Sequence, residues 1–167
     1  MILIAIGANL SANGYKTPLA TCEAAVVLLK QEVDIEVVGC SRWFKSDPVP
    51  MSKQPKFING VVAINTTLSP ESLLSRLHTI ENAFGRVRQV RNEARQMDLD
   101  IIDFNGKIRV SSTPPILPHP RAAERAFVLL PIRDLFPNWQ DPITGETVSD
   151  RIKALSSDIL DICPLTT

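Results

Sequence analysis

Residues 97–104 read MDLDIIDF and are followed by Asn105-Gly106. Alternate residues of a β-strand point to the same face of a sheet, so Asp98 and Asp100 would share one face and the apolar residues beside them the other. An Asn-Gly pair is the two-residue turn most typical of a β-hairpin. The stretch therefore predicts a strand over 97–104 and a hairpin turn into a second strand over 107–110.

Two helices and three further strands are expected on the N-terminal side of this stretch. We expect strands over 2–6, 33–44 and 57–67, a helix from Thr17-Pro18 to about Lys30, and a helix that begins at Ser69-Pro70 and ends before Gly85. Each helix start combines a capping hydroxyl with a proline at the first helical position, where a missing amide costs nothing. Residues 47–55 contain three prolines and are expected to form a loop.

The C-terminal part is expected to be mainly helical. A proline-rich segment over 114–120 leads into a mostly helical stretch over 121–135, kinked or broken near Pro131, and Thr147 caps a last short helix that ends near Leu155. The order β-α-β-β-α-β with appended C-terminal helices predicts an α+β fold, a ferredoxin-like antiparallel sheet with helices packed on it. We expect a single domain over residues 1–167.

The composition excludes several classes of protein. The 167 residues include 18 Lys and Arg against 18 Asp and Glu, so the formal net charge is zero, which argues against nucleic acid or anionic lipid as a partner. There is no apolar stretch long enough for a membrane and no charged segment of a secretory signal, so we expect a cytoplasmic protein. The three cysteines form no CxxC pair and are expected to be reduced thiols rather than zinc ligands.

Asp98 and Asp100 are the first candidate site. Their carboxylates would repel each other on one strand face unless a cation lay between them, and hard oxygen ligands of this kind suit Mg²⁺ together with substrate phosphates. A solvated strand face is the alternative, and the spacing alone leaves both open. The P-loop, the GxGxxG turn and the protein-kinase motifs are absent, so a nucleotide would have to bind by another route.

Arginines gather just before the aspartate strand, at positions 86, 88, 91 and 95. Guanidinium groups bind phosphate oxygens with two parallel hydrogen bonds, and arginines beside carboxylate-bound Mg²⁺ would suit a polyphosphate. A solvated basic loop is the alternative for the arginines alone. The neighbouring aspartates favour the phosphate site.

Phe57 and Asn59 form the third candidate element. Both would lie on one face of their strand, where an aromatic ring and an amide could stack on and hydrogen-bond a flat heterocycle. Taken alone, the pattern is also that of an ordinary core aromatic and a polar residue near a strand end.

These pieces occur together with others in a recognisable order. The chain carries AIGANL from Ala5, Phe57-Ile58-Asn59, IENAFGRVR from Ile80, RQMDLDIIDF from Arg95 and LPHPRAAERAFVLLPI from Leu117. In this it resembles the 6-hydroxymethyl-7,8-dihydropterin pyrophosphokinase family of the folate pathway over essentially its whole length. The resemblance implies transfer of the β,γ-pyrophosphoryl group of ATP to the pterin hydroxymethyl oxygen, with release of AMP.

The resemblance also implies cofactors, substrates and site residues. ATP and the hydroxymethyl dihydropterin would be the small-molecule substrates of a monomer, and Asp98 and Asp100 would hold two Mg²⁺ ions and act in catalysis with Arg86 and Arg95. The implied pterin-binding residues are Gly7, Ser46, Pro48, Val49, Phe57, Asn59 and Phe127. The implied ATP-binding residues are His78, Glu81, Arg88, Arg95, Ile101, His119 and Arg125. Closure of the 48–55 loop and the arginine loop would exclude water.

The chain departs from familiar members at two places near the site. The run Arg91-Asn92-Glu93-Ala94-Arg95 stands where a Trp-Gly-Pro precedes the last arginine, and the loop is one residue shorter. Asp47 places a negative charge beside the expected pterin pocket. A single-stranded RNA-binding module and a catalytically silent pterin or nucleotide sensor are the alternative functions; the low aromatic content and zero net charge count against the first.

Overall fold

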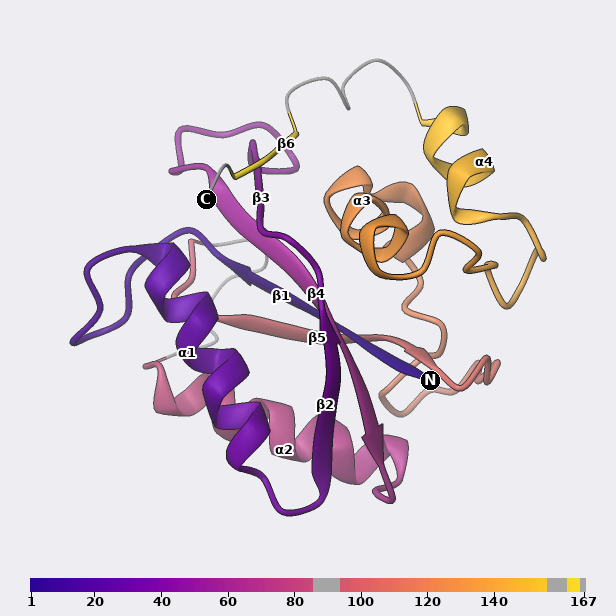
Figure 1. Cartoon of the computed structure of the whole chain (residues 1–167), viewed down its shortest axis with the longest axis horizontal. Coiled ribbons are helices and arrows are strands. Elements are labelled where there is room, and N and C mark those ends of the chain that lie inside the picture. The colour runs from indigo at the N-terminus through magenta and orange to yellow at the C-terminus, as the bar shows by residue number, and fades with distance from the viewer. Residues whose placement is uncertain (86–93, 156–161, 166–167) are drawn as a thin grey trace.

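A computed structural model describes residues 1–85, 94–155 and 162–165 (Figure 1). The elements are β1 (Ile2–Ala8), α1 (Pro18–Gln31), β2 (Ile35–Cys40), β3 (Phe44–Ser46), β4 (Phe57–Thr66), α2 (Pro70–Ala83), β5 (Asp98–Phe104), a 3₁₀ turn (Ala122–Glu124), α3 (Ala126–Leu135), α4 (Val148–Ala154) and β6 (Cys163–Pro164). No helix within the described ranges is long and apolar enough to cross a membrane.

All the strands join one antiparallel sheet. Its order is β5-β1-β4-β3-β6, and β2 also pairs with β4. The unit β1-α1-β2-β4-α2-β5 therefore has the strand order β5-β1-β4-β2, which is the ferredoxin-like arrangement. The predicted fold class is confirmed.

The sheet buries both of its faces. On one face, Ile4, Ile6 and Leu99 pack against α1 and α2, while on the other Leu3 and Ile102 pack against α3 and the chain that follows it. Figure 1 shows the two helix layers on opposite sides of the strands. The appended C-terminal helices thus cover the face that the ferredoxin-like unit leaves open.

The predicted helix starts are confirmed by their caps. The Thr17 hydroxyl accepts a hydrogen bond from the Ala20 amide at 3.1 Å, and the Ser69 hydroxyl accepts one from the Ser72 amide at 3.2 Å. Gly85 follows α2 with φ of +81°, the left-handed conformation expected of a glycine after a helix.

The single strand expected over 33–44 is wrong. β2 ends at Cys40 and β3 begins at Phe44. Between them Ser41 bends the chain: its amide donates to the Val61 carbonyl, and its hydroxyl accepts from the Val61 amide, both at 2.9 Å. A side chain here replaces a backbone partner, so the ladder is interrupted.

The turn at Asn105-Gly106 is present, but the hairpin predicted from it is wrong. Both residues have positive φ, 55° and 68°, as a type I′ turn requires. Arg109 nevertheless bridges to Leu117 instead of pairing with β5. The edge of β5 is taken by another segment, because the His119 amide donates to the Ile102 carbonyl at 2.9 Å. This contact brings His119 next to the aspartate strand.

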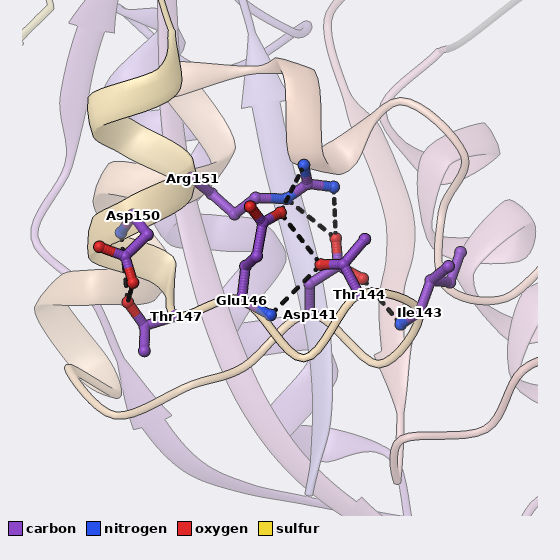
Figure 2. Close-up of polar contacts among 7 residues, drawn as sticks. All are labelled: Asp141, Ile143, Thr144, Glu146, Thr147, Asp150 and Arg151. Atoms are coloured by element: carbon purple, nitrogen blue, oxygen red, sulfur yellow. Dashed lines mark hydrogen bonds and ion pairs between the residues drawn. The ribbon is translucent and has the colours of Figure 1, made fainter.

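The helical stretch expected over 121–135 is divided. Arg125 has an extended backbone between the 3₁₀ turn and α3, whereas α3 continues through Pro131. After α3, a polar cluster joins the connecting loop to α4: Arg151 contacts the buried Asp141 at 2.7 Å and Glu146 at 3.0 Å (Figure 2). Thr147 caps α4 as predicted.

Candidate active site

The sheet register places three predicted site residues in one row. Gly7 of β1 is paired with Asn59 of β4 on one side and with Asp98 of β5 on the other. A Cβ at Gly7 would lie 3.4 Å from the Asn59 Oδ1 atom. Because Gly7 has no side chain, no atoms of residue 7 fill the space between the Asn59 amide and the Asp98 carboxylate. These groups lie on the sheet face that α3 covers farther along.

The amide end of this row is held by a buried hydrogen bond. The Asn59 Nδ2 donates to the Ser46 hydroxyl at 2.9 Å, and the two residues are 5% and 2% exposed. Ser46 is paired in register with the half-buried Phe57. An aromatic ring and a fixed amide thus lie next to each other, as a planar heterocycle would require.

The loop that follows β3 carries two more of the predicted pterin-binding residues. Pro48 is buried, while Val49 is exposed. Asp47, the unexpected negative charge, forms an ion pair with Lys56 at 3.1 Å across the base of the loop. Its charge is therefore partly balanced before any ligand binds.

Arg95 connects the aromatic side of the site with the aspartate side. Its Nη1 lies 2.6 Å from the Asp98 Oδ2, and its guanidinium carbon lies 5.9 Å from the centre of the Phe57 ring. The arginine is a counter-ion for Asp98 in this structure. Positive charge bound at the aspartates, or phosphate bound nearby, would compete for it.

His119 and Arg125 flank the second aspartate. The His119 Nε2 lies 3.8 Å from the Asp100 Oδ2. Burial lowers the pKa of His119 to about 4, with further lowering from Arg125 and Arg121, so the imidazole is neutral at pH 7. Burial also lowers the pKa of Arg125, and the negative charges of Asp100 and Asp98 oppose that effect.

An arginine lies over the ring of each of the two predicted aromatic residues. The Arg125 guanidinium carbon lies 5.4 Å from the centre of the Phe127 ring, as Arg95 lies over Phe57. Phe127 is half-buried in the first turn of α3. Arg95 therefore contacts both the Phe57 ring and Asp98, while Arg125 lies over Phe127 close enough to Asp100 and Asp98 for their charges to act on it.

The side chains of two predicted ATP-binding residues are buried and make contacts within the protein. Glu81 is 1% exposed, and its Oε1 accepts a hydrogen bond from the Leu99 amide at 2.8 Å. Ile101 is 3% exposed in the core under α1 and α2. Glu81 thus holds β5 at the residue between the two aspartates, while His78, one turn before it, is half-buried on α2.

Asn9 is a residue that the sequence interpretation did not single out. It follows β1 directly, is 1% exposed and binds both the 48–55 loop and the backbone of Arg95. The AIGANL motif could have indicated it, since it places Asn9 directly after a buried strand. A buried asparagine side chain needs several hydrogen-bond partners.

The donor set at the aspartates fits magnesium bound with a phosphate ligand. Asp98 and Asp100 are 24% and 38% exposed at their side chains, so both carboxylates reach solvent. Among the residues that the structure describes, no group of three or more His, Cys, Asp and Glu could form a closed protein cage. Two carboxylates completed by water and phosphate oxygens are the usual ligands of Mg²⁺.

Most of the predicted site comes together within these ranges. Asn59, Gly7 and Asp98 are neighbours across three strands, and Arg95 and His119 contact the two aspartates. The predicted Arg86 and Arg88 lie outside the described residues, as does most of the shortened run before Arg95.

Comparisons with known proteins give a consistent result. Residues 3–137 match the family model described as 7,8-dihydro-6-hydroxymethylpterin-pyrophosphokinase. The chain is 36% identical over 148 residues to the 2-amino-4-hydroxy-6-hydroxymethyldihydropteridine pyrophosphokinase of Synechocystis, covering 88% of this chain and 75% of that protein. It is 39% identical over 132 residues to the enzyme of the same name from Bacillus subtilis, covering 79% of this chain and 75% of the other.

Longer proteins contain a similar fold. Wild-type Plasmodium falciparum HPPK-DHPS matches with a TM-score of 0.72 and 11% identity, over 99% of this chain and 48% of that one. The present chain thus spans less than half of that protein. Given the family model and the two bacterial relatives, this chain belongs to the 7,8-dihydro-6-hydroxymethylpterin-pyrophosphokinase family.

Proposed function

We propose that the chain transfers the β,γ-pyrophosphoryl group of ATP to the hydroxymethyl group of 6-hydroxymethyl-7,8-dihydropterin in folate biosynthesis. The observation that carries the proposal is the Asn59–Gly7–Asp98 row, which places a fixed amide next to the first residue of a carboxylate pair. The two relatives named as pyrophosphokinases support the same reaction.

The bonding changes define what the site must do. The hydroxymethyl oxygen forms a bond to the β-phosphorus of ATP, the bond from that phosphorus to the α,β-bridging oxygen breaks, and AMP leaves with the bridging oxygen. The hydroxyl proton is released. The site must therefore hold the hydroxymethyl oxygen in line with the leaving AMP and keep water from taking its place.

The pterin would occupy the aromatic end of the row. Phe57 and Phe127 would stack on its faces, and Asn59, fixed by Ser46, would read its hydrogen-bonding edge. The half-buried rings lie beside charged groups, so stacking would bring the hydroxymethyl group toward the aspartates. Pro48 and Val49 would cover the pocket as the 48–55 loop closes over it.

The triphosphate would occupy the charged end. Asp98 and Asp100 would hold two Mg²⁺ ions, which supply neutralisation of phosphate charge and orientation of the triphosphate when bound. Arg95 would give up its ion pair with Asp98 and bind phosphate oxygens instead. His119 and Arg125 would bind the nucleotide beside Asp100. Arg86 and Arg88 would add further phosphate contacts, Arg86 in a catalytic role.

Glu81 and Ile101 would act on the nucleotide site indirectly, by holding β5 in place. The Glu81 carboxylate is bonded to the Leu99 amide, and the Ile101 side chain lies in the core, so both set the position of the two aspartates. His78 would contribute from the same helix as Glu81.

We also propose a single domain over residues 1–167 that acts as a monomer in the cytoplasm. The cysteines are free, with Cys40 and Cys163 exposed, which suits a reducing compartment. Sizing chromatography that returns a stable dimer would contradict the monomer.

The experiment is to incubate the chain with ATP, Mg²⁺ and the dihydropterin and to identify the nucleotide product. AMP is expected, and ADP or no turnover would overturn the proposal. Asp98→Ala and Asp100→Ala should each cost activity by orders of magnitude. Asp103→Asn is the matched control on the same strand, because Asp103 is 4% exposed and bonded to Trp139 and Gly106, away from the site. It should lower stability and retain turnover.

A further inference from the structure

Asn9 has every polar group of its side chain engaged by two separate segments. Its Nδ2 donates to the Pro55 carbonyl at 3.2 Å and to the Gln54 Oε1 at 3.1 Å. Its Oδ1 accepts from the Arg95 amide at 2.8 Å, and its own amide donates to the Arg95 carbonyl at 3.1 Å. A single buried residue therefore ties the end of the 48–55 loop to Arg95.

The chemistry of the partners fixes the orientation of this amide. The Pro55 carbonyl can only accept a hydrogen bond, and the Arg95 backbone amide can only donate one. A flipped Asn9 would face the carbonyl with its oxygen and the amide with its nitrogen, losing both bonds. The arrangement works only with the nitrogen toward the loop and the oxygen toward Arg95.

The two segments lead directly to the two halves of the site. Phe57 follows Pro55 by two residues, and Asp98 follows Arg95 by three. The Arg95 side chain itself lies between the Phe57 ring and the Asp98 carboxylate. A shift of the Arg95 backbone that accompanied loss of its Asp98 ion pair would reach Pro55 through the Asn9 amide.

We propose that Asn9 is a positioning residue that couples the two substrate subsites, so that Mg²⁺-nucleotide binding at the aspartates strengthens binding of the pterin. The coupling is reciprocal, because a link between two binding equilibria changes both affinities by the same factor. This inference rests on the proposed function, since it assigns the two subsites to those two substrates.

A matched control variant distinguishes the coupling role of Asn9 from a purely structural role. Thr21 of α1 is fully buried. Its hydroxyl accepts a hydrogen bond from the Ala12 amide at 3.1 Å and donates one to the Thr17 carbonyl at 3.2 Å, and neither bond involves Arg95 or the 48–55 loop. Thr21→Val removes both bonds with little change of shape. It should lower stability as a buried hydrogen-bond loss does, but it leaves the link between the subsites in place.

The experiment measures the Kd of the dihydropterin with and without the α,β-methylene analogue of ATP and Mg²⁺. The analogue cannot be cleaved at the bond that the reaction breaks, so binding alone is observed. In the unaltered chain the analogue should tighten pterin binding by on the order of tenfold. In Asn9→Ala this ratio should fall toward one, in Gln54→Ala it should fall partly, and in Thr21→Val it should stay unchanged.

The outcomes separate the inference from the function on which it rests. Failure of the unaltered chain to bind the pterin or the analogue would overturn the proposed function. Binding of both with a ratio of one, an unchanged ratio in Asn9→Ala, or an equal loss in Thr21→Val would overturn the coupling alone. If Asn9→Ala does not fold, Gln54→Ala decides: a ratio below that of Thr21→Val supports the coupling, and an equal ratio overturns it.

Discussion

Replacing Glu81 tests how the fold holds the two aspartates. The Glu81 Oε1 accepts the Leu99 amide at 2.8 Å from a side chain that is 1% exposed. Leu99 lies between Asp98 and Asp100, so this bond fixes the strand at the centre of the carboxylate pair.

The cost of Glu81→Ala follows from what it removes. A buried hydrogen bond to a charged acceptor contributes about 1.5–3 kcal/mol, and the lost methylene packing adds about 0.8 kcal/mol. We therefore expect the free energy of unfolding to fall by about 2–4 kcal/mol. Glu81→Gln keeps an oxygen acceptor of the same shape and should stay within about 1 kcal/mol of the original chain.

The rate of AMP formation should depend on the hydrogen bond that residue 81 makes to β5, and not on the charge of residue 81. Under conditions where both variants are folded, Glu81→Ala should lower the rate of AMP formation by roughly tenfold or more, because the aspartates lose their alignment. Glu81→Gln should keep most of the rate. Urea unfolding and the AMP assay give the two quantities. An unfolding free energy of Glu81→Ala equal to that of the original chain, or equal loss of activity in both variants, would mean that Glu81 does not hold the aspartates in position.

Three further predictions concern the pocket, the histidine and the C-terminal cluster. Ser46→Ala releases the Asn59 amide and should raise the KM for the pterin roughly fivefold, the equivalent of about 1 kcal/mol for one hydrogen bond, with the Kd for ATP unchanged. In metal-free protein, NMR titration of His119 should give a pKa of about 4, because burial, Arg125 and Arg121 disfavour its charged form. Since the unfolded chain then binds more protons, the contribution of His119 to stability should fall as the pH drops from about 6.5 toward 4 and level off below, which comparison with a His119→Gln variant isolates. Asp141→Asn weakens the contact with Arg151 and should cost about 1–3 kcal/mol of unfolding free energy without changing the KM for either substrate.

Each of these has its own contradicting result. An unchanged pterin KM in Ser46→Ala would mean that the hydroxyl does not orient the amide. A His119 pKa near 6.5 would mean that the ring is solvated. Loss of substrate binding in Asp141→Asn would mean that the C-terminal cluster reaches the active site.

The features predicted correctly from sequence are those that local chemistry decides. Thr17-Pro18 and Ser69-Pro70 start helices because a cap and a proline act on the backbone next to them. The shared face of Asp98 and Asp100 follows from the period of a strand.

The errors arise where distant segments compete for the same backbone groups. Residues 107–110 do not pair with β5, because the His119 amide already binds the Ile102 carbonyl. Strand 33–44 is divided because the Ser41 hydroxyl takes the Val61 amide. No local pattern records either contact.

The same limit applies to the site. The alternation of β4 and β5 predicts which side chains share a face, but the row across Gly7 depends on strand order and register. The resemblance assigned Glu81 to the ATP site, and the structure adds its bond to the strand. Asn9 was missed because its partners are more than forty positions away.

In the proposed reaction, two phosphoryl groups pass together from ATP to the pterin. The most direct measurement uses ATP with an isotopic label in the β-phosphate and separates the nucleotide from the pterin after turnover. The label is expected on the pterin, with unlabelled AMP as the other product. Label that remains in ADP, or that is released as free pyrophosphate without joining the pterin, would rule out pyrophosphoryl transfer to the pterin.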